Sequence, residues 1–205
     1  MLKPGKSLVF VACLLPAAWL VYATFTNNLG VNPAETLQLE TGIWALRFLL
    51  ITLAVTPLRR VTGWNRAIQF RRMLGLFAFF YATLHFLTYA ILDTGFAWAL
   101  ILDDLAKRPF IMAGMAAFAS MIPLALTSTR GWIRRLGRHW QVLHRLIYVS
   151  AIAGALHFVW KVKVAVGEPV YYAAIVAVLL GFRLVWSLRR RGLGLVFERF
   201  SRSKT

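Results

Sequence analysis

The chain has 205 residues, of which 60% are hydrophobic and only 15% are charged. A soluble domain of this length carries far more charge, so this composition excludes a water-soluble globular protein. The net charge of +17 does not indicate nucleic-acid binding, because the basic residues stand in short gaps between apolar runs and form no continuous face. A single cysteine, Cys13, excludes a disulfide framework and a cysteine-bound cluster.

Six apolar runs follow one another along the chain, each close to the ~20 residues that a helix needs to cross a bilayer. They cover residues 8–26, 43–58, 73–92, 110–127, 142–160 and 170–188. Lipid offers open backbone groups no hydrogen-bond partner, so each run is predicted to be a helix, the second closed by Pro57 and the fourth kinked at Pro123. We therefore expect an all-α integral membrane protein with six transmembrane helices in one domain. No internal repeat is evident on inspection.

Basic residues are distributed unequally between the gaps. Seventeen Lys and Arg residues lie before the first span, after the second, after the fourth and in the tail, against four in the other gaps. Six of the seven acidic residues lie in those other gaps. The positive-inside rule therefore predicts that both termini lie in the cytoplasm, with residues 189–205 as a basic cytoplasmic tail.

Ionisable side chains inside a membrane are costly, which makes the histidines functional candidates. His85 lies in the third span, His144 and His157 lie in the fifth, and His139 stands just before the fifth, where an interfacial role is expected. Both spans enter from the predicted cytoplasmic side, so His85 and His157 come within a turn or two of the same depth at ~1.5 Å per residue. Neutral imidazoles at one depth can hold an iron from both sides, so this pair is predicted to clamp a haem. The alternative is that they form hydrogen bonds between packed helices. The small side chains at residues 150, 151 and 153–155 leave room for a macrocycle or simply for helix packing.

His144 predicts a second redox site nearer the cytoplasm. It stands thirteen residues before His157, which is roughly 20 Å along a helix. Thirteen residues turn an ideal helix by about 220°, so the two rings do not share a face. Either two cofactors lie on different flanks of this helix, or the helix is distorted. The inner site also lacks an evident second histidine, because Arg71 stands fourteen residues before His85 and His139 could serve only if its loop folds back.

Several arginines are candidates for binding an anion. Arg47 and Arg183 lie within spans, and Arg145 follows His144. Each could extend to the interface, or pair with a haem propionate or a flavin phosphate. The arginines within residues 59–72 could bind an anionic cofactor or an acidic partner, although topology signals are the expected role for most of them.

Two segments carry a family resemblance. One is residues 71–76 running on to Leu84-His85-Phe86, and the other is residues 135–148 followed by His157. Together they resemble the ferric-reductase-like transmembrane domain shared by NADPH oxidases and metalloreductases. The small size and the lack of a nucleotide-binding domain are most similar to the bacterial haem-binding subunits of methionine sulfoxide reductase systems. Arg71 departs from the oxidase branch, where a fourth histidine would be expected.

The resemblance implies a cytochrome b subunit of the bacterial inner membrane that carries one or two haems b and an FMN. Electrons would come from a cytosolic flavin reductase or from quinol and pass to a periplasmic molybdopterin-containing subunit that repairs oxidised methionines. His85, His144 and His157 match the haem-binding histidines of the family, and Arg71, Arg72 and Arg145 are the candidates for contacts to the cofactors.

Other functions stay open. A self-sufficient ferric or metalloreductase, a superoxide-generating oxidase or another quinol-linked cytochrome b would use the same histidines. No gap is long enough for a nucleotide-binding fold, so no substrate-reducing site of its own is expected. A non-redox scaffold or small transporter would instead place Arg47 and Arg183 along a substrate path.

Overall fold

The computed structural model describes residues 4–162 and 167–202, and every regular element in this part of the chain is helical. Six segments are long and apolar enough to cross a membrane: Gly5–Phe25, Pro33–Thr62, Arg71–Asp93, Pro109–Leu126, Arg138–Val162 and Glu168–Arg189. The prediction of an all-α membrane protein with six spanning helices is therefore confirmed. Three lysines of the orientation argument, Lys3, Lys163 and Lys204, lie outside the described residues.

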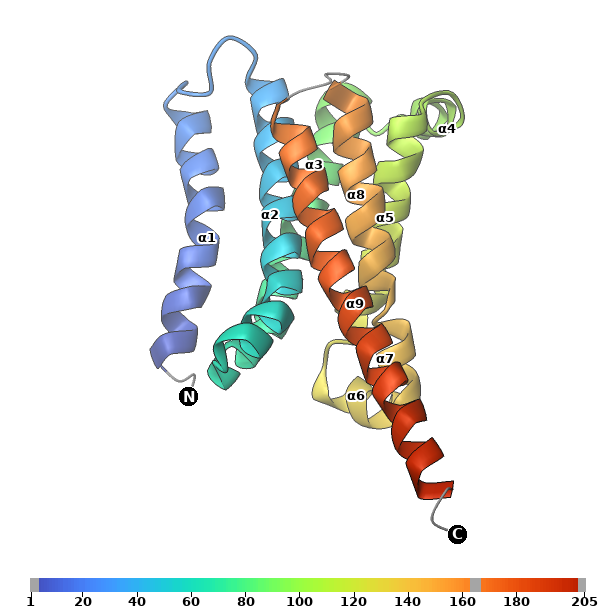
Figure 1. Ribbon diagram of the computed structural model, residues 1–205. Coiled ribbons are helices and arrows are strands. Elements are labelled where there is room, and N and C mark those ends of the chain that lie inside the picture. The colour runs from blue at the N-terminus through green and yellow to red at the C-terminus, as the bar shows by residue number, and fades with distance from the viewer. Residues whose placement is uncertain (1–3, 163–166, 203–205) are drawn as a thin grey trace.

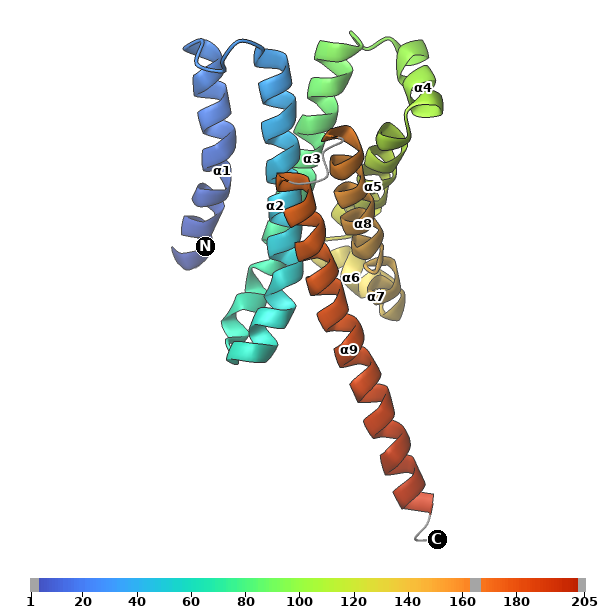
Figure 2. The same cartoon turned by 45° about the horizontal axis from the view of Figure 1, so that its top comes forward.

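The long helices are α1 (Pro4–Phe25), α2 (Pro33–Thr62), α3 (Arg71–Thr88), α5 (Pro109–Leu126), α8 (Leu146–Val162) and α9 (Glu168–Arg202). Shorter elements connect them: η1 (Asn65–Gln69), the π-helical η2 (Tyr89–Asp93) that continues α3, α4 (Trp98–Lys107), α6 (Arg130–Leu136) and α7 (Arg138–Leu143). The helix α9 continues well beyond the expected end of the sixth span, and in Figure 2 it extends past the other helices.

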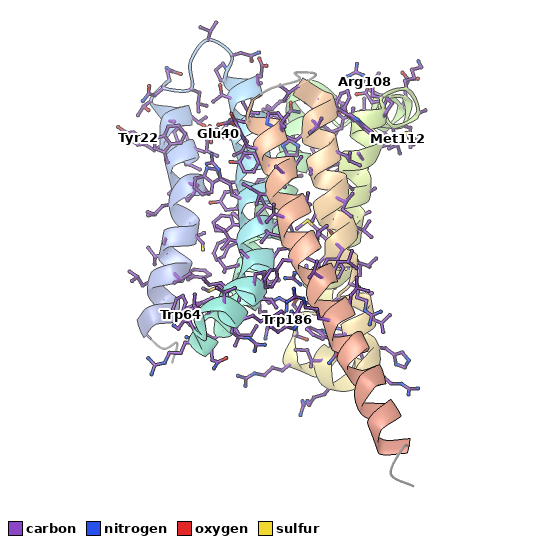
Figure 3. The ribbon with its side chains drawn as sticks, viewed as in Figure 1. Tyr22, Glu40, Trp64, Arg108, Met112 and Trp186 are labelled. Atoms are coloured by element: carbon purple, nitrogen blue, oxygen red, sulfur yellow. The ribbon has the colours of Figure 1, made fainter. Side chains whose placement is uncertain are left out.

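Two ends of the bundle can be distinguished. The start of α1, the end of α9, α6 and α7 lie together at one end (Figure 1), which we call the basic end. The opposite end, which we call the acidic end, carries α4 and the first turns of α2 and α9. Figure 3 places Trp64 and Trp186 near the basic end, and Tyr22, Glu40 and Arg108 near the acidic end. The assignment of the basic end to the cytoplasm stays a prediction.

The boundaries of α2 follow from its end residues. Pro33 occupies its first turn, and the Asn32 side chain accepts a hydrogen bond from the backbone N–H of Glu35 at 3.3 Å. Gly63 closes the helix in a left-handed conformation (φ 71°) and donates to the Arg59 carbonyl. Pro57 does not end the helix as expected. Prolines are tolerated inside membrane helices, where neighbouring groups can satisfy the freed backbone.

A tyrosine from α3 fastens α1 to the bundle. The Tyr81 hydroxyl accepts a hydrogen bond from the Ala17 N–H at 3.0 Å and donates to the Cys13 carbonyl at 2.8 Å. Those two backbone groups are four residues apart and would pair in an uninterrupted helix. Pro16 lies between them, so the hydroxyl inserts where a proline already disturbs α1. Tyr81 is fully buried as a result.

The bundle is organised around two helix hairpins. Helix α2 packs mainly against α3, and α5 packs mainly against α8. Helix α9 crosses the outside of α8 and α2, whereas α1 stands at the edge of the bundle (Figure 1). The main cavity lies between these two hairpins.

Candidate functional site

A cavity of about 560 Å³ lies between α2, α3, α5 and α8. Its volume falls within the roughly 300–1,000 Å³ typical of small-molecule and cofactor sites. Apolar side chains, including Leu46, Leu49 and Met121, line its deep part. Charged side chains gather at the acidic end, where the cavity is bordered by Glu35, Asp93, Arg108 and Lys161. The cavity therefore suits a largely apolar molecule with a charged edge.

His85 from α3 and His157 from α8 both line this cavity, and their ring centroids lie 5.8 Å apart with the rings at 75°. Metal–imidazole bonds are about 2 Å long, so two rings on either side of one metal have centroids about 6 Å apart. The structure thus brings together the two histidines that the sequence placed at one depth.

Each imidazole is held by a backbone carbonyl. His85 Nδ1 lies 2.8 Å from the Gln38 carbonyl oxygen, and His157 Nδ1 lies 2.7 Å from the Phe110 carbonyl oxygen. A carbonyl oxygen can only accept, so Nδ1 carries the proton and donates in both rings. The Nε2 lone pairs are therefore left for a ligand, as is usual for histidines bound to a metal.

A glycine lies against each ring. A Cβ atom added to Gly42 would come within 3.0 Å of His85 Nδ1, and one added to Gly114 would come within 2.7 Å of His157 Nδ1. Any side chain at either position would therefore push the ring away from its carbonyl. Sequence reasoning missed both glycines, because Gly42 lies just before the expected second span and a glycine inside a span, such as Gly114, is usually read as a packing residue.

The two halves of this site repeat each other. The residues whose carbonyls accept from the imidazoles, the glycines and the histidines are all related by the same step of 72 residues (38 to 110, 42 to 114 and 85 to 157). The tripeptide Leu84-His85-Phe86 recurs at that step as residues 156–158. The chain thus does carry an internal correspondence at these positions, contrary to the expectation of no repeat, and the recurring Leu-His-Phe tripeptide was its signal in the sequence. The α2–α3 and α5–α8 hairpins therefore offer equivalent histidines to one shared space.

Flat aromatic rings form one wall of the cavity. Phe86 and Phe118 stack at 5.2 Å and 15°, and Phe118 stacks on Phe79 at 5.7 Å and 7°. Phe86 and Phe118 both line the cavity. A wall of parallel rings fits a planar aromatic guest.

The histidine pair is not a complete protein-only metal site. Within the described residues no group of three or more His, Cys, Asp or Glu side chains could hold a metal ion. Structural and catalytic zinc sites use three or four protein ligands. Two imidazoles with free Nε2 atoms, an apolar slot and a flat wall instead fit a macrocycle that brings its own equatorial ligands.

His144 does not line this cavity. It caps α7, its ring stacks on Trp140 with a centroid distance of 3.8 Å, and its Nδ1 lies 3.1 Å from the Trp140 carbonyl oxygen. The helix is interrupted at His144 and Arg145, between the end of α7 and the start of α8. Of the two alternatives left open by the spacing of the histidines, the structure shows the distorted helix.

Two partly buried arginines, Arg71 and Arg183, lie near the basic end. Arg183 donates to the Tyr148 hydroxyl at 3.1 Å and to the Leu53 carbonyl at 2.7 Å, and Arg71 lies close enough to interact electrostatically with Arg183. Three buried polar atoms here have no hydrogen-bond partner: Thr56 Oγ1, Arg183 Nε and Trp186 Nε1. The carboxylates among the described side chains belong to the acidic end. Cations and unpaired polar groups without a carboxylate indicate a place for an anion supplied from outside the chain.

The other predicted arginines are placed differently. Arg72 and Arg145 are exposed, so neither is held by the core. Arg47 donates to the Tyr172 hydroxyl at 2.8 Å and lies over the Trp44 ring at 4.8 Å. It does not line the cavity, and its contacts tie α2 to α9. This fits a role in packing better than the predicted anion site or substrate path.

Comparison with known proteins gives a consistent result. The family described as "Ferric reductase like transmembrane component" matches residues 41–155. The chain is also similar to proteins named "Protein-methionine-sulfoxide reductase heme-binding subunit MsrQ". One from Xanthomonas axonopodis pv. citri is 50% identical over 188 residues, covering 89% of this chain and 86% of the relative. One from Polaromonas naphthalenivorans is 52% identical over 186 residues (89% and 84%), and one from Rhodospirillum rubrum is 48% identical over 191 residues (93% and 92%). No solved structure matches the chain significantly.

Proposed function

The chain belongs to the ferric-reductase-like transmembrane family and, within it, to the MsrQ haem-binding subunits, and from this premise we propose that it carries electrons across the bacterial inner membrane. The acceptor we propose is MsrP, the periplasmic molybdopterin-containing subunit that reduces methionine sulfoxide in oxidised proteins. The chain itself would hold the electron carriers and would reduce no protein substrate directly.

One observation carries this proposal: His85 and His157 both line an apolar cavity with their ring centroids 5.8 Å apart, each with Nδ1 bound to a backbone carbonyl. We propose that these two residues would hold a haem b through their Nε2 atoms. The haem supplies a one-electron carrier when it is bound. The carbonyls of Gln38 and Phe110 orient the imidazoles, and the surrounding apolar side chains would exclude water from the site.

The direction of transfer follows from the predicted topology. If the basic end faces the cytoplasm, the histidine pair lies in the periplasmic half of the membrane, and the charged border of the cavity faces the periplasm. Electrons held between His85 and His157 would then be close to a partner docked at the acidic end. A donor on the cytoplasmic side, either a flavin reductase or quinol, would deliver them at the basic end.

We assign the basic end to the second cofactor, an FMN. Arg71 and Arg183 would hold its phosphate, with the exposed Arg72 and Arg145 as further candidates, and His144 stands at the same end as a contact to the ring or as the ligand of a second haem. The unpaired Arg183 Nε and Trp186 Nε1 support this assignment, because both are hydrogen-bond donors that lack an acceptor.

The function can be tested with the purified protein in sealed vesicles. We expect a b-type spectrum, quantified as a pyridine haemochrome, that is reduced by a flavin reductase outside the vesicle and reoxidised by MsrP and methionine sulfoxide inside it. Fast reoxidation by ferric chelates or by oxygen, with no dependence on MsrP, would instead support a self-sufficient reductase. A correctly folded preparation without haem would refute both functions.

The FMN assignment predicts a specific loss in the Arg71→Gln variant. A hydrogen bond to a charged group is worth about 1.5–3 kcal/mol, so FMN affinity should fall roughly 10–100-fold, while the haem spectrum is unchanged. The fluorescence of flavin released on denaturation measures the bound fraction. Arg66→Gln is the matched control, because Arg66 is an exposed arginine in η1 at the same end. Equal FMN content in both variants would show that Arg71 does not bind the FMN phosphate.

A further inference from the structure

The border of the main cavity is less symmetric than its interior. The two hairpins supply equivalent histidines, glycines and carbonyls, but they differ in the charges that they place at the cavity's acidic end. The α2–α3 hairpin contributes carboxylates, from Glu35 and Asp93, and the α5–α8 hairpin and its approach contribute cations, from Arg108 and Lys161. The interior alone would accept a flat guest in either of two opposite orientations, whereas the border distinguishes them.

Lys161 is the cation best placed to attract an anionic group on a molecule bound in the cavity. It stands one turn after His157, its ammonium group lies 5.6 Å from the centre of the Phe110 ring, and it is close enough to interact electrostatically with both His85 and His157. Among the described side chains no carboxylate lies within ion-pair distance of it. Lys161 is thus an exposed cation at the border of the cavity, without a counter-ion among the described side chains.

Arg108 is already oriented by its neighbours. Its Nε lies 3.0 Å from an Asp104 oxygen, and the other oxygen of Asp104 accepts a hydrogen bond of 2.9 Å from the Tyr89 hydroxyl. One side of the guanidinium is thus fixed, and its terminal nitrogens are left for a second anion. The opposite carboxylate, Asp93, is turned to Gln38, whose amide donates to it at 2.8 Å.

We propose that Lys161 and Arg108 bind the two propionates of the haem and so fix its orientation between His85 and His157. This inference rests on the proposed function, because it takes a haem as the guest of the cavity. Haem carries its two carboxylates on one edge. That edge would be repelled by Glu35 and Asp93 and attracted by the two cations, so only one of the two orientations is favoured.

The assignment has an electrostatic consequence. Propionate charge favours the ferric iron, and a neighbouring ammonium group offsets it. Loss of the positive charge at Lys161 should therefore stabilise the oxidised form and lower the reduction potential. Loss of either cation should also speed the release of haem, because one carboxylate would lose its partner.

The test compares Lys161→Gln and Arg108→Gln with Lys161→Arg in the complete haem-loaded protein. We expect Lys161→Gln to lower the ratio of reduced to oxidised haem up to tenfold at a fixed applied potential, tenfold being a 59 mV shift for one electron. Both glutamine variants should lose haem several-fold faster to an apoglobin acceptor, and Lys161→Arg should behave as the parent does. Lys107→Gln is the control, because Lys107 is an exposed lysine on α4 already paired with Asp103.

The outcomes separate this inference from the function on which it rests. If the parent protein binds haem through His85 and His157 while both glutamine variants match Lys107→Gln in potential and haem release, the propionate assignment is wrong and the haem site stands. If the parent binds no haem, the proposed function fails first. A second measurement uses haem dimethyl ester, in which the carboxylates are blocked. With this haem the parent and Lys161→Gln should become alike in haem release, and a difference that persists would overturn the assignment.

Discussion

Replacing either His85 or His157 with alanine is expected to abolish the b-type spectrum of the cavity haem. Each ring supplies one Nε2 lone pair to the shared space, and within the described residues no third metal-binding side chain joins them to take over. The absorption spectrum and the pyridine haemochrome of the purified variants measure the loss. Full haem content with an unchanged spectrum in both variants would end the case for this pair as ligands.

Two controls separate the loss of a ligand from the loss of the fold. His139→Ala removes an exposed histidine near the basic end, so it should keep the parental spectrum. Haem supplied together with free imidazole should restore a protein-bound six-coordinate spectrum to His85→Ala or His157→Ala, because the deletion leaves a ring-sized space where the imidazole can replace the lost ligand. An unfolded variant would show no such recovery. His144→Ala should leave the cavity haem in place, since His144 does not line this cavity.

The features that could be predicted from the sequence are those set by distance along one helix. Bilayer thickness determines the length of each apolar run, so the six spans could be recognised. The constant rise of a helix relates a position in the sequence to a depth, so His85 and His157 could be placed at one level before their rings were seen at 5.8 Å. Neither the length of a span nor the depth of a residue depends on which helices are neighbours.

The features that could not be predicted depend on lateral packing and on local backbone. The Arg183 guanidinium bonds to groups on α8 and α2, 35 and 130 residues away, and no sequence spacing reports such a meeting. The break at His144 places that ring beside Trp140, and the spacing of the histidines could not choose between a distorted helix and two cofactors on different flanks. Gly42 and Gly114 are informative only once the rings are known to lie against them.

These two glycines give the second large prediction. Gly114→Ala is expected to impair haem binding although Gly114 itself supplies no ligand atom. The added Cβ would lie 2.7 Å from His157 Nδ1, so the ring must move away from the Phe110 carbonyl that orients it. Loss of a residue that orients a metal ligand typically costs about 10–100-fold in affinity, and we expect a loss of haem affinity of this size. Gly42→Ala should act in the same direction but more weakly, because its Cβ would lie 3.0 Å from His85 Nδ1.

Helix content and haem affinity together distinguish a displaced His157 ring from general destabilisation of the protein. Alanine is favoured over glycine inside a helix by about 1 kcal/mol, so Gly114→Ala should not lower the helix content of the protein while it weakens haem binding. Gly75→Ala is the matched control in α3: its Cβ would make an ordinary 3.6 Å contact with Thr52, and haem affinity should be unchanged. Circular dichroism and haem titration of the three variants decide the point. Equal haem affinity in Gly114→Ala and Gly75→Ala would show that the carbonyl-bound orientation of His157 does not control its use as a ligand.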